Sequence, residues 1–283
     1  MPGIDRTALT AIVEEAGDIA LKGFREGEEV ERWHKAPDQP LTASDIAVDN
    51  FLRTALRDLD PKMGWLSEES QAVPETAKSA GTWIVDPIDG TRDFMRGRSG
   101  WALSVAYCVG GQPQLAALYA PARQEMWFAE AGNGAMLNGT SISASRHTEL
   151  QGARVPTTQL SNIDQQLAMV EKPNSIALRM AMVANDQADL VATLRWGHAW
   201  DVAAALLIAR EAGALCTDAL GQNMDFSDSD APIFGILCSA RNIHGAALKH
   251  LESRARNVLE QQPIGRSAAS LQRHQADTNK SKI

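Results

Sequence analysis

The organisation of the chain follows from residues 83–91, which read Trp83-Ile84-Val85-Asp86-Pro87-Ile88-Asp89-Gly90-Thr91. The apolar start predicts a buried strand, and the proline predicts its end, because proline has no N–H to donate to a sheet. Two carboxylates three residues apart follow, and a Gly-Thr pair then lets the chain turn and expose backbone N–H groups. Oxygen ligands suit Mg²⁺, and free N–H groups suit phosphate. This stretch therefore predicts both parts of a metal-assisted phosphate site.

The composition is that of an ordinary globular protein: 283 residues, of which 44% are hydrophobic and 22% charged. The formal net charge of −8 argues against nucleic acid or an anionic membrane as the main partner. The three cysteines lack the spacing of a metal site or a redox motif, which predicts buried free thiols. We see no signal peptide over residues 1–21 and no apolar stretch of the ~20 residues that span a bilayer. We therefore expect a cytoplasmic protein without membrane contact.

Helices precede strands in the first half of the chain. Apolar residues at helical spacing predict an amphipathic helix over 6–24. A second helix is expected after the candidate caps Thr42 and Ser44, and Pro61 ends it. Four strands follow, and a Gly-Gly pair forms a hairpin turn between the second and the third. Their expected bounds are 82–86, 101–109, 114–119 and 125–129.

The second half has a different pattern, in which Ala-rich helices alternate with short apolar strands. The expected helices cover 175–184 and 200–213, and the expected strands cover 189–194, 214–217 and 233–238.

This change predicts a boundary near residues 143–150 and two halves with different tasks. Residues 1–145 are expected to form an α+β half that binds metal and phosphate. Residues 146–260 are expected to form an α/β half that completes the site. Residues 261–283 are polar and aperiodic, which predicts a disordered tail.

Further acidic positions give weight to the Asp-x-x-Asp-Gly pattern, which alone is weak because Asp and Gly are common in turns. Glu68, followed by a second glutamate, ends a short apolar run. Asp201 lies in the first turn of an expected helix, and Asp45 lies at the start of another. Carboxylates at helix starts are often N-caps, so a capping role and a functional role both remain open for Asp45 and Asp201 taken singly.

Taken together, these segments resemble the inositol monophosphatase family. The resemblance covers roughly residues 8–255, and its specific motifs are Asp86–Thr91 and Trp200–Ala204, together with the glutamate pair that starts at Glu68. It implies an α+β or α/β fold, namely a layered αβαβα sandwich of the inositol monophosphatase and sugar phosphatase type, with the site between the two halves. It also implies a Mg²⁺-dependent, lithium-sensitive phosphomonoesterase and a homodimer.

The resemblance further implies roles for individual residues. Gly90 and Thr91 would offer N–H groups to the phosphate. Glu68, Thr91 and Asp45 would act in catalysis, with Thr91 positioning water and Asp45 pairing with Thr91 or with a metal-bound water. One Mg²⁺ ion would activate the attacking water and another would stabilise the leaving group, so no Cys or Ser nucleophile is required. The implied ligands of two or three Mg²⁺ ions are Glu68, Asp86, the carbonyl of Ile88, Asp89 and Asp201.

Substrate selection is expected at the rim of this site. Arg195 stands six residues before Asp201, where inositol-preferring members of the family usually carry an acid. Arginine is a bidentate partner for carboxylate or phosphate, so a substrate with a second anionic group and a plain surface arginine both remain open. Ser175 lies where a small-residue pair is usual, and we expect it to contribute to specificity. His198 lies near the same rim, with a packing role as the alternative.

The resulting functional hypothesis is hydrolysis of inositol monophosphate or a related small phosphate ester by metal-activated water. A 3′(2′),5′-bisphosphate nucleotidase acting on 3′-phosphoadenosine 5′-phosphate is the alternative that Arg195 favours. Histidinol phosphate, fructose bisphosphate and the 2′-phosphate of NADP are further candidate substrates. A non-catalytic regulatory or binding protein is the alternative from another class.

Overall fold

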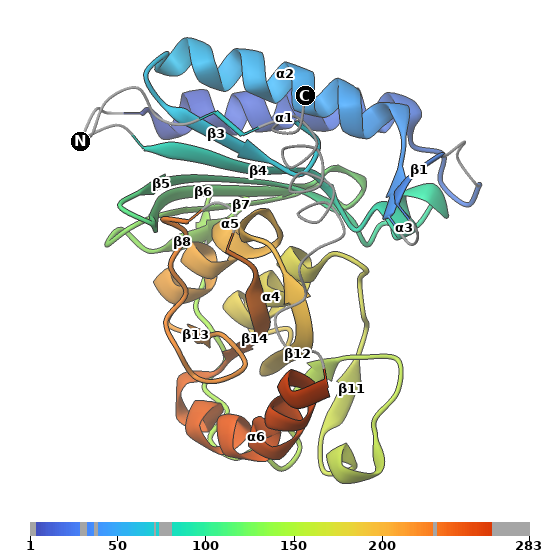
Figure 1. The fold of residues 1–283 in the computed structure, drawn as a ribbon, viewed down its shortest axis with the longest axis vertical. Helices are drawn as coiled ribbons and strands as arrows, with labels where there is room; N and C mark the ends of the chain where they lie inside the picture. Colours follow the sequence, from blue (N-terminus) through green and yellow to red (C-terminus); the bar gives the residue numbers. More distant parts are fainter. Residues whose placement is uncertain are drawn as a thin grey trace, which may run out of the picture.

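Helices and sheets alternate in five layers, which confirms the predicted αβαβα sandwich (Figure 1). Two helices form the first layer, followed by a seven-stranded sheet, two further helices, a three-stranded sheet and a last helix. The computed structural model describes residues 4–28, 33–36, 39–70, 72–73, 81–228 and 231–261.

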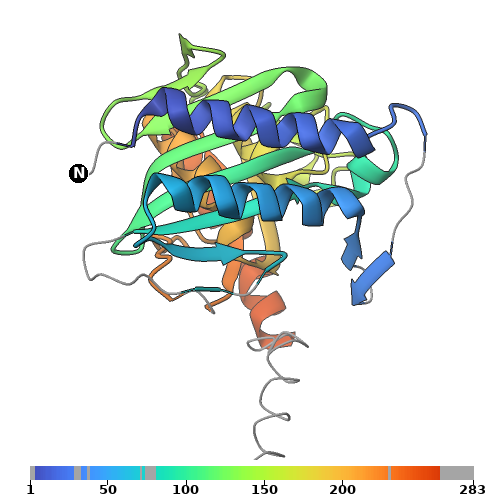
Figure 2. The same cartoon turned by 90° about the horizontal axis from the view of Figure 1, so that it is seen from above.

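The first layer consists of α1 (Arg6–Gly23) and α2 (Ala43–Leu59), which lie side by side over one face of the larger sheet (Figure 2). Each helix buries one apolar stripe, and this burial supplies most of the stability of such helices. At the start of α2, Thr42 and Asp45 form a reciprocal capping box. Both predicted helices are confirmed, with Thr42 rather than Ser44 as the cap.

The larger sheet contains β3 (Gly64–Ser67), β4 (Thr82–Asp89), β5 (Ala102–Val109), β6 (Gln112–Ala120), β7 (Glu125–Glu130), β8 (Ala135–Leu137) and β9 (Thr140–Ser141). These strands are neighbours in sequence order. β3 and β4 are parallel, and the other neighbouring pairs are antiparallel. The predicted Gly-Gly hairpin joins β5 to β6, so this part of the prediction is confirmed.

Strand β4 continues to Asp89, so the prediction that it ends at the proline is wrong. Pro87 instead disturbs the ladder, because the register with β5 shifts between Asp86 and Asp89. Before the shift, successive side chains face opposite sides of the sheet. Trp83 packs in the core under α1 and α2, and Ile84 packs in the core on the other face. By the same alternation, Asp86 points toward the second half of the molecule.

The remaining layers consist of α4 (Ile176–Ala184), α5 (Ala199–Glu211), β12 (Leu190–Gly197), β13 (Leu215–Thr217), β14 (Ile233–Ser239) and α6 (His244–Gln261). α4 and α5 lie between the two sheets, and α5 is buried along most of its length (Figure 1). The smaller sheet has the antiparallel order β12-β14-β13, and α6 covers its outer face. The predicted helices and strands of this half are confirmed, but α6 was not anticipated from the sequence.

None of the helices within the described ranges is long and apolar enough to cross a membrane.

Short elements complete the described chain. The short elements are α3 (Thr91–Met95), β1 (Trp33–Ala36), β2 (Gln39–Leu41), β10 (Arg154–Pro156), β11 (Ala168–Val170), and the 3₁₀ turns η1 (Pro121–Arg123), η2 (Asn162–Asp164) and η3 (Arg241–Ile243).

One apolar core contains residues from both halves of the chain, from Leu66 to Cys238. The boundary near residue 145 therefore separates two topologies around a shared core, and the assignment of separate tasks to the two halves stays a prediction.

The expected tail starts at Gln261, which is still the last residue of α6, and residues 262–283 lie outside the described residues. All three cysteines are buried free thiols, as predicted.

Candidate active site

Five carboxylates from distant parts of the chain come together at the end of β4. Asp86 and Asp89 lie in β4, Glu68 follows β3, and Asp201 and Asp45 lie in the first turns of α5 and α2. Burial raises the pKa of Asp86 well above its usual value, and the charges of the other four acids raise it further. Charges act this strongly only at short range. The structure thus brings together the five acids that the sequence analysis selected.

The parallel pairing of β3 with β4 positions two of these acids. Ser67 lies opposite Val85 in the ladder, and the N–H of Glu68 donates to the carbonyl of Val85 at 3.3 Å. Glu68 and Asp86 are therefore neighbours where the two strands end. The carboxylate of Asp86 accepts a hydrogen bond from the N–H of Ile88 at 3.0 Å, which stabilises the backbone around the proline.

Asp89 links the larger sheet to α4. Its Oδ2 accepts hydrogen bonds from the hydroxyl of Ser175 at 2.5 Å and from the N–H of Ala177 at 2.8 Å. Burial raises the pKa of Asp89 to about 6, although these hydrogen bonds and the charge of Arg179 act in the opposite direction. One carboxylate oxygen of Asp89 is thus occupied by the start of α4, which fixes the orientation of the group.

Asp201 and Asp45 both cap helices and belong to the acid cluster. The Oδ2 of Asp201 accepts a hydrogen bond from the N–H of His198 at 2.7 Å, and Oδ2 of Asp45 accepts one from the N–H of Thr42 at 2.8 Å. Burial raises the pKa of Asp201 to about 8. The capping and functional interpretations of these acids are therefore compatible, because one carboxylate oxygen can cap the helix while the group stays in the cluster.

The turn after β4 requires glycine. Gly90 has a φ of 92°, and a Cβ at this position would lie 2.8 Å from the carbonyl oxygen of Gly100 and from the nitrogen of Ser175. The chain can therefore pass close to the start of α4 only at a residue without a side chain. Thr91 opens α3, and its hydroxyl donates to the carbonyl of Ile88 at 3.1 Å. N–H groups in the first turn of a helix have no intrahelical acceptor, so this turn can donate to an anion.

The donor set suits a hard divalent cation. Among the described residues, no three His, Cys, Asp or Glu side chains stand in a preformed metal arrangement. Oδ2 of Asp89 and Oδ2 of Asp201 instead accept hydrogen bonds from the starts of α4 and α5. The pKa values of Asp86, Asp89 and Asp201 are all raised, which means that their charges lack compensation. Oxygen-only ligands with excess negative charge are those that Mg²⁺ prefers.

The three predicted specificity residues occupy different positions. Arg195 is exposed on β12, and it borders a cavity of about 150 Å³ that Asp201 and His198 also line. The ring of His198 stacks on Trp200 at 4.4 Å, and burial lowers its pKa while the charge of Glu68 acts to raise it. Ser175 is fully buried and donates to Asp89, so in this structure it orients that carboxylate. Its expected contribution to specificity stays a prediction.

Three charged residues near the site were missed from the sequence. Asp93 accepts a hydrogen bond from the N–H of Asn174 at 3.0 Å and so supports the loop before α4. Lys172 and Arg179 lie on either side of Ser175 in the chain. Arg179 is a lone cation within the apolar run Ile176–Ala184, and this was the available signal, because such a run rarely buries a charge without a reason.

Known proteins are similar to this chain in sequence and in fold. The family model described as the inositol monophosphatase family matches residues 4–260. Inositol monophosphatase 2 of Solanum lycopersicum is 30% identical over 232 residues, which cover 76% of this chain and 87% of the relative. The Nus factor SuhB of Pasteurella multocida (strain Pm70) is 29% identical over 217 residues, which cover 72% of this chain and 80% of the relative.

A solved structure agrees with these matches. The inositol monophosphatase (IMPase) of Thermotoga maritima superposes with a TM-score of 0.78 and 25% identity, over 90% of this chain and 100% of that chain. The chain belongs to the inositol monophosphatase family.

Proposed function

We propose that the protein is a Mg²⁺-dependent phosphomonoesterase that hydrolyses inositol monophosphate or a related small phosphate ester. The observation that supports this proposal most directly is the cluster of Glu68, Asp86, Asp89 and Asp201 beside the Gly90 turn. It combines acidic oxygen ligands, of which Asp86, Asp89 and Asp201 have raised pKa values, with backbone donors for an anion. The names of the relatives agree with a phosphatase.

The acids are proposed to hold the metal. Mg²⁺ held by these acids would lower the pKa of an attacking water and would supply positive charge for the leaving group. The hydrogen bonds of Asp89 and Asp201 to the starts of α4 and α5 hold these carboxylates in place before the substrate arrives. The proposed ligands of two or three ions are Glu68, Asp86, the carbonyl of Ile88, Asp89 and Asp201.

The remaining groups are proposed to bind the phosphate and the water. The N–H groups of Gly90 and Thr91 would donate to phosphoryl oxygens, where negative charge accumulates during transfer. The hydroxyl of Thr91, which is held by the carbonyl of Ile88, would orient the attacking water. Asp45 is fixed by Thr42 and would accept a hydrogen bond from that water. No covalent intermediate with the protein is needed.

Replacing Asp86 tests the assignment. We expect Asp86→Asn to reduce kcat/KM by more than about 100-fold, because loss of one central ligand disturbs both metal and phosphate binding. Phosphate release from inositol 1-phosphate, measured with and without Mg²⁺, is the readout. The fold should survive, since the substitution removes an uncompensated buried charge, and circular dichroism checks this. Asp58→Asn on the exposed side of α2 is the matched control. Turnover near the wild-type level at saturating Mg²⁺ would refute the assignment.

A second candidate within the same chemistry is a 3′(2′),5′-bisphosphate nucleotidase. Arg195 at the rim favours it, because an arginine there is suited to a second anionic group. A panel of inositol 1-phosphate, histidinol phosphate, fructose 1,6-bisphosphate, NADP and adenosine 3′,5′-bisphosphate separates these substrates.

Lithium sensitivity, a homodimer and a cytoplasmic location are part of the proposal. They rest on the family resemblance, and the buried free thiols agree with a reducing compartment. The same panel assayed with added Li⁺ tests lithium sensitivity, and light scattering coupled to gel filtration tests the homodimer. Absence of phosphate release from every substrate would instead favour a non-catalytic role; one relative is named a Nus factor.

A further inference from the structure

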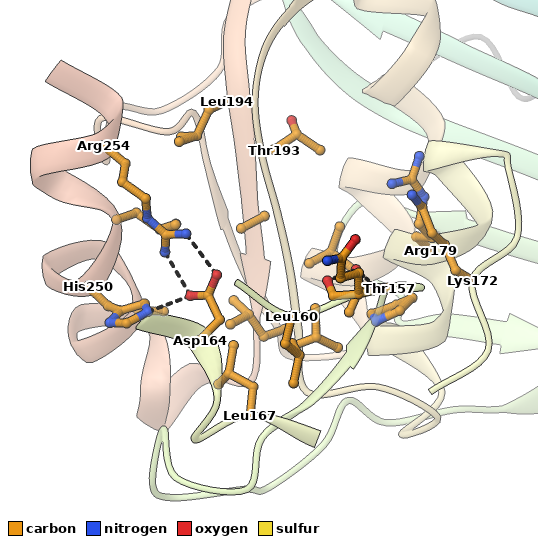
Figure 3. A pocket seen from close by; sticks show the side chains of 18 of the residues that line it. Thr157, Leu160, Asp164, Leu167, Lys172, Arg179, Thr193, Leu194, His250 and Arg254 are labelled. Atoms are coloured by element: carbon orange, nitrogen blue, oxygen red, sulfur yellow. Dashed lines mark hydrogen bonds and ion pairs between the residues drawn. The ribbon is translucent and has the colours of Figure 1, made fainter. Parts of the chain in front are cut away.

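A cavity of about 370 Å³ adjoins the candidate active site on the side of the second half (Figure 3). It lies between β12, the segment before α4, and α6. Thr193 and Arg195 line both this cavity and the smaller one that contains Asp201, so the two are contiguous along β12. The cavity is large enough for part of a small ligand whose reacting end lies at the acid cluster.

Arg179 on one wall of this cavity is buried without a counterion. It is 8% exposed, and no described carboxylate lies within ion-pair distance of it. Its Nε donates to the carbonyl of Ser175 at 3.2 Å, and its Nη2 donates to the carbonyl of Asn174 at 3.1 Å. Nη1 makes no hydrogen bond to the described part of the chain. Buried arginines are almost always paired with an anion, whereas Asp89 and Asp93 act on Arg179 through their charges without forming an ion pair with it.

Two further cations border the same cavity. Lys172 and Arg195 are exposed at its edge, and neither has an ion-pair partner among the residues that the structure describes. Burial lowers the pKa of Lys172, and the charges of Arg179 and Arg195 lower it further. Asp93 is close enough to act in the opposite direction on Lys172 and Arg179. Asp89 acts on Arg179 in the same direction as Asp93, and Arg195 lowers the pKa of Asp201, so the cations have acidic neighbours but no direct ion pair among the described residues.

The cation cluster lies beside the phosphate turn. The guanidinium of Arg179 folds back to the carbonyls of Asn174 and Ser175, and the nitrogen of Ser175 is 2.8 Å from the Cβ position of Gly90. On the other side, the charge of Arg195 lowers the pKa of Asp201. An anion held by the cations would therefore lie near both the phosphate turn and Asp201.

The opposite wall of the cavity offers no comparable site. There Asp164 is paired with His250 at 2.7 Å and with Arg254 at 2.9 Å, so these charges already compensate one another (Figure 3). Among the described residues that line the cavity, the cations without an ion pair, Lys172, Arg179 and Arg195, lie on the side that faces the acid cluster.

We propose that Lys172, Arg179 and Arg195 bind a second phosphate group of the substrate, so that the preferred ester is a small bisphosphate. This inference rests on the proposed phosphatase function. It extends the role of Arg195 to a three-cation subsite and adds a buried residue that forms no ion pair within the described chain. Lys172 and Arg195 are exposed, so an incoming substrate can reach them, and they distinguish a bisphosphate from a monophosphate. Arg179 is buried and also stabilises the loop before α4.

The test compares matched pairs of esters that differ only in the second phosphate. The pairs are 3-hydroxypropyl phosphate with propane-1,3-diyl bisphosphate, and adenosine 3′-phosphate with adenosine 3′,5′-bisphosphate. We expect the Mg²⁺-loaded wild-type protein to prefer the bisphosphate of at least one pair by about tenfold or more in kcat/KM, as one charge-assisted contact provides. In Lys172→Gln and Arg195→Gln, kcat/KM for that bisphosphate should fall by about tenfold more than kcat/KM for its monophosphate, mainly because KM rises.

Exposed cations elsewhere provide controls of the same chemistry. Lys249→Gln on α6 and Arg241→Gln on η3 should leave the preference unchanged. Equal losses on both members of a pair in Lys172→Gln and Arg195→Gln would mean that these residues act structurally, and would overturn the inference. Wild-type hydrolysis of monophosphates without a bisphosphate preference would overturn it and leave the proposed function intact. Hydrolysis of no ester at all would overturn both.

Discussion

Ser175 shows how one buried side chain connects the acid cluster to the second half of the molecule. Its hydroxyl donates to Asp89 at 2.5 Å and accepts from the N–H of Leu178 at 2.9 Å. It therefore caps α4 and orients a proposed metal ligand at the same time. Because the residue is fully buried, neither contact can be replaced by water without rearrangement of the helix start.

Removing this hydroxyl should affect stability and metal binding together. We expect Ser175→Ala to lower the free energy of unfolding by about 1–2 kcal/mol, as loss of an N-cap does. It should also raise the Mg²⁺ concentration for half-maximal activity by about tenfold or more, because Asp89 loses its orienting partner. Urea unfolding and a Mg²⁺ titration of activity measure these effects. Ser141→Ala, at an exposed position in β9, is the control. A stability loss without any change in Mg²⁺ dependence would contradict the positioning role.

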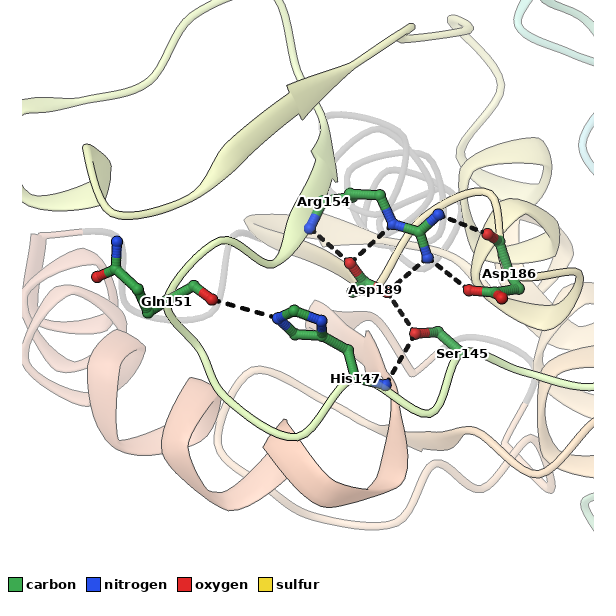
Figure 4. Close-up of polar contacts among 6 residues, drawn as sticks. All are labelled: Ser145, His147, Gln151, Arg154, Asp186 and Asp189. Atoms are coloured by element: carbon green, nitrogen blue, oxygen red, sulfur yellow. Dashed lines mark hydrogen bonds and ion pairs between the residues drawn. The ribbon is translucent and has the colours of Figure 1, made fainter.

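At the scale of elements, a charge network around the buried Asp189 connects β10 to the start of β12 (Figure 4). The carboxylate of Asp189 accepts hydrogen bonds from the N–H of Arg154 at 2.7 Å, from its Nε at 2.9 Å and from the hydroxyl of Ser145. Burial acts to raise the pKa of Asp189, but these hydrogen bonds lower it to about 2. The network keeps β12, which carries Arg195, in a defined position relative to the segment before it.

Breaking this network should destabilise the protein. We expect Arg154→Met to lower the free energy of unfolding by about 1–3 kcal/mol at neutral pH, because Asp189 is buried and loses hydrogen bonds while the partial exposure of Arg154 screens its charge. The folded-state pKa of Asp189 is depressed, so the stabilisation is present above the ordinary value of 3.8 and is lost as the pH falls through about 2. Urea unfolding measures the difference.

A surface pair provides the comparison for that variant. Arg256 pairs with Glu252 on α6, and its side chain is 69% exposed. Arg256→Met should change the free energy of unfolding by less than about 1 kcal/mol, since exposed ion pairs contribute little. Equal effects of Arg154→Met and Arg256→Met would show that the network around Asp189 does not connect the two strands.

For the whole molecule, the uncompensated acid cluster couples stability to both pH and metal. The folded-state pKa values of Asp89 and Asp201 are raised to about 6 and about 8, and that of Asp86 is also raised. Without metal, the folded state therefore binds more protons than the unfolded state between about pH 4 and 8. Stability must then fall as the pH rises through this window. Metal ions that replace the protons should reverse this loss.

This coupling predicts a pH-dependent stabilisation by Mg²⁺. At about pH 8, Mg²⁺ at roughly 100 times its dissociation constant should raise Tm by about 5 °C or more relative to protein in a chelator. At about pH 5.5 the increase should be smaller, because protons compete for Asp89 and Asp201. Differential scanning fluorimetry measures both. An equal Mg²⁺ effect at the two pH values would argue against metal binding by these acids, and Asp86→Asn should abolish most of the effect at pH 8.

Local pattern was sufficient to predict most elements of the fold. The helix starting after Thr42 and the hairpin between β5 and β6 depend on caps, periodicity and turn residues, all of which are encoded within a few positions. Pro87 was interpreted as the end of a strand, but pairing with β5 on the far side of the proline carries β4 to Asp89. α6 was overlooked, because its apolar stripe is thin and its burial depends on the smaller sheet.

By itself, the sequence determined the strand, the turn and the acids that cap the helices, since these features follow from backbone sterics and local hydrogen bonds. The resemblance of its motifs then identified the family. Only the tertiary structure decided which groups meet. It brings Glu68 and Asp201 to Asp86, turns the hydroxyl of Ser175 inward, and buries Arg179 without a counterion. Distances between remote residues and the electrostatics of burial depend on how the layers pack, and no local pattern records that packing.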